Sequence, residues 1–140
     1  MTPEEYGDFE FACDWLAAPG ANSGIMYRVT EEGDATWHTG PEFQVLDDAS
    51  LGEFPDLKHS VGALYDMLAP PTKVARLAGE WNRARITVHG WELEHWLNGF
   101  LVAKTDMRSP VGGRLRTQSK FAKMEGFARA PRGHIALQDH

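Results

Sequence analysis

Apolar and polar side chains alternate along the first part of the chain, between Asp8 and Trp15. A period of two residues is typical of a strand that has one face in a core and the other in water. The positions expected to point inward are Phe9, Phe11, Cys13 and Trp15. A turn rich in glycine, alanine and asparagine follows at 18–24, and 25–29 is predicted as the second strand.

Alternating or continuous apolar segments, separated by turn residues, predict six further strands. These are 37–47, 62–68, 81–88, 91–97, 100–104 and 133–140. In the last of them Ile135 and Leu137 are expected to point inward, and His134, Ala136, Gln138 and His140 outward.

The strongest local signal is a hairpin at Asn98-Gly99, because this dipeptide adopts the positive φ angles of a two-residue turn. The segments 48–60, 70–79 and 109–113 are predicted as loops, and 119–124 as one helical turn. No amphipathic helix of ordinary length is expected.

Short strands at regular spacing with glycine and proline turns favour an all-β sandwich or jelly roll. The 140 residues are enough for a single domain with a real core. The first predicted strand begins close to the start of the chain, and the last runs to its end. This arrangement would leave sheet edges with unpaired backbone groups. We therefore expect residues 1–140 to be one domain that lacks terminal strands and is truncated at both ends.

Composition excludes several classes of function. Hydrophobic residues make up 42% and charged residues 24% of the chain, as in ordinary soluble globular proteins. The net charge is -6 and no run of lysine and arginine occurs, so nucleic-acid binding is not expected. One cysteine, Cys13, excludes an internal disulfide framework. The sequence contains no signal peptide and no apolar run that could span a membrane.

The segment Gly40–Asp47 carries the main candidate chemistry. On a regular strand Glu42 and Gln44 share one face, while Phe43 and Val45 share the other, as on the lining of a carbohydrate groove. Asp47 falls on the wrong face unless a one-residue bulge near 45–46 brings it round. The alternative is an ordinary exposed strand with solvated acids.

Several stretches together resemble one known family, the 3-keto-disaccharide hydrolase domain, in order and spacing from about residue 4 to the end. No single motif is strong, but the combination is specific. The stretches are Glu5–Phe9, Asn22–Ile25, Thr36–Asp48, Gly62–Asp66, Gly79–Asn82, Glu94–Gly99, Ser119–Met124 and Gly133–His140.

The resemblance implies a concanavalin A-like lectin/glucanase jelly roll that cleaves glycosides carrying a ketone at C3. An upstream sugar 3-oxidoreductase would install that ketone. A base would remove the acidified C2 hydrogen, a cation or metal would stabilise the enolate, and the C1–O bond would break by elimination or hydrolysis. Members of the family usually have a leading segment and a closing strand that this chain lacks.

The resemblance also implies roles for individual residues. Glu42 and Asp47 are expected in the groove as base or metal ligands. His140 is a further candidate for base or metal ligand, and Lys120 is expected to stabilise the enolate. The residues expected to contact the substrate are Asn22, Ser23, Arg28, His38, Gln44, Tyr65, Trp96 and Gln138.

Simpler interpretations stand beside these roles. His140 and Lys120 could be exposed, solvated side chains. Trp96 could merely cover its sheet, and His38 shares a face with Glu42 only if that strand stays regular across the Gly40-Pro41 break. His95 is predicted as a buried, hydrogen-bonded core histidine.

A divalent metal could be required, with Glu42, Asp47 and His140 as candidate ligands, and no nucleotide cofactor is expected. The family setting implies an extracellular or periplasmic location. Two rival functions remain open: a non-catalytic carbohydrate-binding module of the same fold, and a structural or interaction fragment without affinity for sugars.

Overall fold

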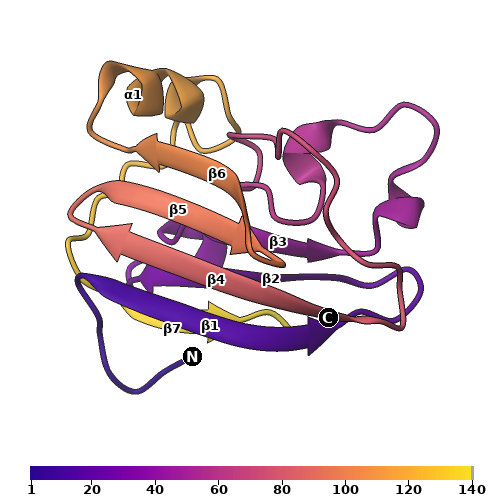
Figure 1. The fold of residues 1–140 in the computed structure, drawn as a ribbon. Helices are drawn as coiled ribbons and strands as arrows, with labels where there is room; N and C mark the ends of the chain where they lie inside the picture. Colours follow the sequence, from indigo (N-terminus) through magenta and orange to yellow (C-terminus); the bar gives the residue numbers. More distant parts are fainter. Residues whose placement is uncertain (140) are drawn as a thin grey trace.

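The computed structural model describes residues 1–139, and these form two antiparallel sheets that face each other (Figure 1). The four-stranded sheet has the order β1 (Phe9–Leu16), β4 (Trp81–His89), β5 (Glu92–Leu97) and β6 (Phe100–Asp106). The three-stranded sheet has the order β3 (Glu42–Leu46), β2 (Asn22–Val29) and β7 (His134–Leu137). The predicted all-β jelly-roll sandwich is confirmed.

The four-stranded sheet follows the alternation of its sequence. β1 pairs with β4 without a register shift, and Phe11 lies opposite Ile86. The hairpin between β5 and β6 turns at Asn98 and Gly99, whose φ angles are 51° and 83°. The prediction of a type of turn that needs positive φ at both positions is therefore correct.

The core lies between the two sheets and is built from apolar side chains of both. His95 is fully enclosed there, as predicted: its Nε2 lies 2.8 Å from the Tyr27 hydroxyl and its Nδ1 lies 3.1 Å from the Gly62 carbonyl oxygen. Burial lowers the pKa of His95 to about 4 because the core cannot solvate an imidazolium.

The predicted strand at 37–47 is shorter than expected. Residues Thr36–His38 form a 3-10 helix, and the strand begins only at Glu42. Gly40 approaches Val29 and the Tyr27 carbonyl so closely that a Cβ would not fit, which fixes the break before the strand. The segment 62–68 is not a strand either, since Gly62 and Asp66 adopt positive φ angles of 83° and 59°.

Helix α1 (Pro110–Thr117) occupies part of the segment predicted as loop. The Ser109 side chain accepts a hydrogen bond from the Gly112 amide, and Pro110 takes the first turn, which are ordinary helix-start features. The two glycines at 112–113 concealed this signal. A Cβ at Gly112 would overlap the Asp106 carbonyl oxygen, so close packing of the helix on the end of β6 requires glycine.

The last strand is confined to His134–Leu137. Ile135 is buried as predicted, but Leu137 is 63% exposed because it lies at the end of an edge strand. Ala136, predicted to face outward into solvent, is buried with Met26 and Val29 on the other face of the sheet.

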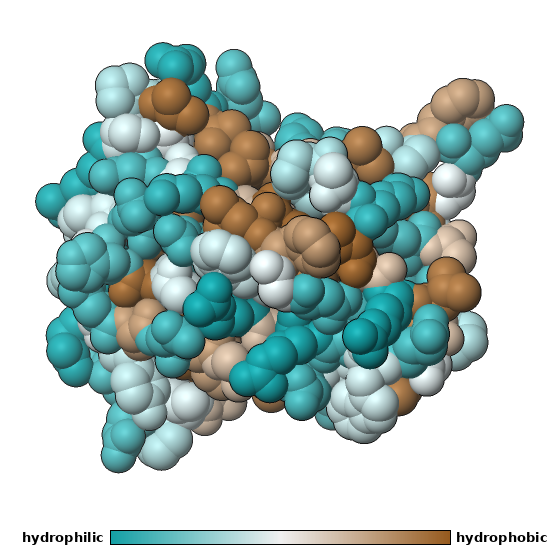
Figure 2. Space-filling model, viewed as in Figure 1, coloured by the Kyte–Doolittle hydropathy of each residue, from teal (hydrophilic) through white to brown (hydrophobic). Residues whose placement is uncertain are grey.

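Two more 3-10 helices, Asp48–Leu51 and Leu57–His59, interrupt the expected loop at 48–60. The loop between them projects from the body of the molecule at the upper right of both views (Figure 1, Figure 2), and Phe54 within it is 90% exposed.

Candidate active site

Strand β3 presents its side chains to two faces as predicted, but both faces are covered. Phe43 and Val45 enter the core, whereas Glu42 and Gln44 lie on the opposite face and are only 8% and 2% exposed. The Gln44 amide donates to the His59 carbonyl oxygen at 3.1 Å, which ties β3 to the loop that covers this face. The alternative of an exposed strand with solvated acids is therefore wrong.

The Glu42 carboxyl lies in a cradle that only glycine can provide. Gly24 of β2 lies diagonally across from Glu42, and a Cβ at Gly24 would overlap Glu42 Oε1. Burial raises the pKa of Glu42 to about 7, and the positive charge of Lys120 acts in the opposite direction. This group can therefore exchange a proton near neutral pH.

Lys120 is held over three aromatic rings. Its Nζ lies 4.5 Å from the ring centroid of Tyr65, 4.7 Å from that of Trp37 and 5.3 Å from that of Phe121. Cation–π contacts of this kind fix the direction of an otherwise mobile ammonium group. Tyr65 is half-buried, and burial together with the negative charge of Glu42 raises the pKa of its hydroxyl.

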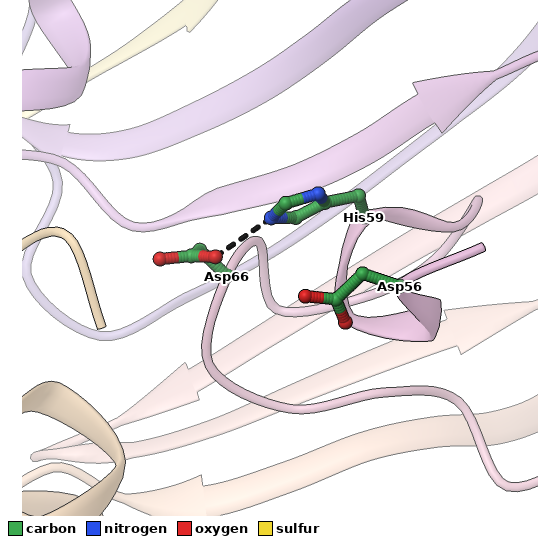
Figure 3. Close-up of side chains that lie close together, drawn as sticks. All are labelled: Asp56, His59 and Asp66. Carbon is green, nitrogen blue, oxygen red and sulfur yellow. Dashed lines mark hydrogen bonds and ion pairs between the residues drawn. The ribbon is translucent and has the colours of Figure 1, made fainter. Parts of the chain in front are cut away.

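His59 and Asp66 form a hydrogen-bonded pair (Figure 3). His59 Nε2 and Asp66 Oδ1 are 2.6 Å apart, and the imidazole stacks on the Tyr65 ring with a centroid distance of 4.8 Å. Asp66 Oδ2 accepts the Lys120 amide at 2.8 Å. Burial alone would raise the pKa of Asp66, but the hydrogen bonds from Lys120 and His59 hold it below its usual value.

Asp56, His59 and Asp66 together offer two carboxylates and an imidazole within 4.8 Å of one another, a donor set that suits a divalent cation. In the structure these donors are already engaged. The His59–Asp66 contact is a direct hydrogen bond, and Asp56 Oδ1 accepts the Lys58 amide at 3.1 Å. A cation bound here would have to break the histidine–aspartate contact.

Asp47 does not join Glu42. The pairing of β2 with β3 runs from Asn22–Leu46 to Met26–Glu42 without a register shift, so the expected bulge is absent. The Asp47 carboxylate instead accepts hydrogen bonds from the amides of Gly20 and Ala49, at 2.9 and 3.2 Å. Its position after the end of β3 makes it the cap of a 3-10 helix, at the opposite end of the strand from Glu42.

Three predicted substrate contacts also lie elsewhere. Arg28 lies at a register shift near the C-terminal end of β2, and its guanidinium donates to the Gly7 carbonyl oxygen and lies 3.7 Å from Asp8. His38 lies in the 3-10 helix rather than on the strand, and its Nδ1 accepts the amide of Asp34. Trp96 lies on the solvent face of the four-stranded sheet, where Arg85 stacks over its ring at 4.5 Å.

Of the remaining predicted site residues, some lie near Glu42 and others do not. The Ser23 hydroxyl donates to the Gln138 backbone carbonyl oxygen at 2.6 Å, and the Gln138 backbone N–H donates to the Gly24 carbonyl oxygen, beside the Glu42 cradle. Asn22 pairs with Leu46, at the Asp47 end of the strands. His140 lies outside the described residues.

The sequence thus indicated Glu42, Gln44, Tyr65 and Lys120, which the structure brings together. It did not indicate Trp37, His59 and Asp66. His59 lies in a segment predicted as loop, and Trp37 and Asp66 lie in segments that were predicted as strands but form a 3-10 helix and a turn. Their position depends on tertiary contacts rather than on a local pattern.

Comparison with known proteins places this geometry in a family. The profile of the 3-keto-alpha-glucoside-1,2-lyase-like domain matches residues 1–140. The chain belongs to this family. The resemblance inferred from the sequence is therefore confirmed.

A 3-keto-disaccharide hydrolase of Bacteroides thetaiotaomicron is 31% identical over 134 residues, which cover 85% of this chain and 46% of that protein. The chain thus spans about half the length of this curated relative. Two crystal structures of candidate glycosyl hydrolases from Parabacteroides distasonis superpose with TM-scores of 0.88 and 0.82, at 30% and 27% identity. The alignments cover 99% of this chain and 68% and 73% of those chains.

The carbohydrate-binding module CBM66 of Bacillus subtilis shares the fold, with a TM-score of 0.50 and 13% identity over 96% of this chain and 68% of that one. Among the described residues, no helix is long and apolar enough to cross a membrane.

Proposed function

We propose that this site cleaves glycosides whose sugar carries a ketone at C3, by removing the C2 proton and eliminating the group on C1. The observation that carries the proposal is the buried carboxyl of Glu42, whose pKa of about 7 suits a general base at neutral pH. The family is named for a lyase and the curated relative is named a hydrolase. Both outcomes can follow from one elimination product.

The chemical steps balance with the groups present. Glu42 takes the C2 proton, and the electron pair of the C2–H bond forms an enolate whose charge lies on the C3 oxygen. The ammonium group of Lys120 would stabilise that oxygen. The enolate then collapses to the ketone with a C1–C2 double bond, the C1–O bond breaks, and the departing oxygen accepts a proton. Addition of water to the double bond would complete a hydrolysis.

Two aromatic side chains support the remaining roles. The Trp37 ring is 37% exposed beside Lys120 and offers a flat apolar surface for the sugar. A tyrosine hydroxyl is protonated at neutral pH, and that of Tyr65, whose pKa is raised by burial, could donate to the departing oxygen. The stacked His59 would hold Tyr65 in position.

The positions of the carboxylates favour this mechanism over that of an ordinary glycosidase. Such an enzyme needs a pair of carboxyl groups, one on each side of the scissile bond. Asp47 is bound to backbone amides at the other end of β3, and Asp66 is paired with His59. The substrate ketone would come from an upstream sugar oxidoreductase. That partner and an extracellular or periplasmic location stay predictions.

The exposed Trp37 would serve a non-catalytic sugar-binding module equally well, and one assay separates the two functions. The protein is incubated with a 3-keto-glucoside and with the matching unoxidised glucoside, and NMR identifies the products. We expect cleavage of the keto substrate alone. Cleavage of the plain glucoside would contradict the mechanism, and binding without turnover would favour the module. Loss of cleavage on addition of a chelator would indicate a cation, for which Asp56, His59 and Asp66 are the candidate ligands.

A further inference from the structure

A second cavity, of about 400 Å³, lies between α1, the ends of β5 and β6, and the segment 127–129. We call it the arginine pocket, because three of its lining side chains are Arg108, Arg116 and Arg129. Trp91 and Thr117 contribute to its wall, and no aspartate or glutamate lines it. None of the residues around Glu42 is part of this lining, so the pocket is separate from the candidate active site.

The positive charge of the arginine pocket is not balanced by the protein. Among residues 1–139, none of the pocket's three guanidinium groups lies within 4.0 Å of a carboxylate oxygen, although the Arg108 backbone amide donates to Asp106 Oδ1 at 2.8 Å. Arg83 and Arg85 on the four-stranded sheet, by contrast, pair with Asp14 and Glu10. This grouping occurs in a chain whose net charge is -6. Burial, together with the nearby charge of Arg129, lowers the pKa of Arg116. Like charges held together in this way favour binding of an anion.

Two of the guanidinium groups are held in place before any ligand arrives. The Arg108 guanidinium stacks over the Trp91 ring with a centroid distance of 4.0 Å. Arg116 donates to the Met124 carbonyl oxygen through one terminal nitrogen, and its Nε is buried without a partner among the described residues. An arginine fixed by stacking or by the backbone loses little freedom when it binds, and its remaining N–H groups match an oxyanion.

We propose that the arginine pocket binds an oxyanionic group, namely a sulfate, phosphate or carboxylate. Arg108 and Arg116 supply fixed donors, and the exposed Arg129 supplies the third positive charge of the lining. The group could be free or carried by a sugar. In either case its recognition depends on the three arginines and not on Glu42.

The test is a titration of the folded protein with sodium sulfate, sodium phosphate, glucuronate and glucose 6-phosphate at constant ionic strength, set with sodium chloride. Binding is followed through the Trp indole and Arg side-chain NMR signals. We expect saturable shifts at Trp91 and Arg116. Neutral glucose should not produce them. Comparison of the inorganic anions with the sugar acids shows whether the sugar adds affinity.

Three variants decide the assignment. Arg116→Gln and Arg129→Gln should each weaken binding by about tenfold or more, because each removes charge-assisted hydrogen bonds. Arg83→Gln, which removes an exposed arginine paired with Asp14, is the matched control and should bind as the wild type does. Arg129 is exposed, so its variant should fold even if the Arg116 variant does not. Equal affinity of all variants for the oxyanions would overturn the proposal. So would the absence of any saturable signal beyond that seen in sodium chloride alone.

Discussion

At the scale of single residues, Glu42 was predictable and its surroundings were not. Alternation in a five-residue strand is enough to predict that the side chains of Glu42 and Phe43 point to opposite faces of the sheet. Trp37, His59 and Asp66 reach the same site from 3-10 helices and loops, and no local pattern in the sequence connects them. The prediction for Asp47 failed because no bulge turns it toward Glu42, and its carboxylate is bound instead to two backbone amides.

The substitution Lys120→Met tests the electrostatic interaction between the Lys120 ammonium group and the Glu42 carboxylate. Because the ammonium group lowers the pKa of Glu42, its removal should raise that pKa further above 7. The acidic limb of the kcat/KM profile should then move to higher pH, and kcat should fall by about 10²-fold as the enolate loses its cation. Lys123→Met, at another exposed lysine three positions along, is the control and should leave the profile unchanged. Identical acidic limbs for Lys120→Met and the wild type would show that the two groups do not interact.

At the scale of elements, the four-stranded sheet was predicted well and the connections poorly. β1, β4 and the β5–β6 hairpin have alternating sequences and an unambiguous turn, so local rules determine them. The irregular segments 36–41 and 62–68 depend on close contacts at Gly40 and Gly62, which only the folded chain reveals. The same holds for Gly24, where the sequence indicated a turn and the structure shows a cradle for a carboxyl group.

Gly24→Ala tests that cradle. The added methyl would overlap Glu42 Oε1, so we expect a loss of about 1–3 kcal/mol in the free energy of unfolding and a loss of activity. Urea unfolding measures the first effect. In a Glu42→Ala background the space is empty, and the same substitution should cost much less. An equal cost in both backgrounds would mean that the methyl does not meet the Glu42 side chain.

At the scale of the whole molecule, two buried groups give the stability opposite dependences on pH. The folded pKa of Glu42 is raised from 4.5 to about 7, so its contribution is fully present below pH 4.5 and is lost as the pH rises to 7. The folded pKa of His95 is lowered from 6.5 to about 4, so its contribution is present above pH 6.5 and is lost as the pH falls to 4. Between pH 4.5 and 6.5 the two effects largely cancel.

Glu42→Gln should expose the contribution of His95. Without the carboxyl, the free energy of unfolding should rise between pH 4 and 6.5 and then level off. Above pH 7 the variant should be more stable than the wild type, by on the order of 1–3 kcal/mol, because a desolvated charge has been removed. Urea unfolding of both proteins across this range measures the difference. Parallel curves would show that Glu42 is not desolvated in the folded protein.

The most direct test of the central claim is the fate of the hydrogen at C2. The wild type and Glu42→Gln are incubated in D₂O with a 3-keto-glucoside, with an enzyme-free control for spontaneous exchange, and NMR follows C2 of substrate and product. Abstraction by Glu42 predicts that deuterium enters at C2 with the wild type, and that both exchange and cleavage fall to the enzyme-free level in the variant. Cleavage that leaves the original hydrogen at C2 would contradict the elimination mechanism. Unchanged exchange in Glu42→Gln would contradict the role of Glu42 as the base.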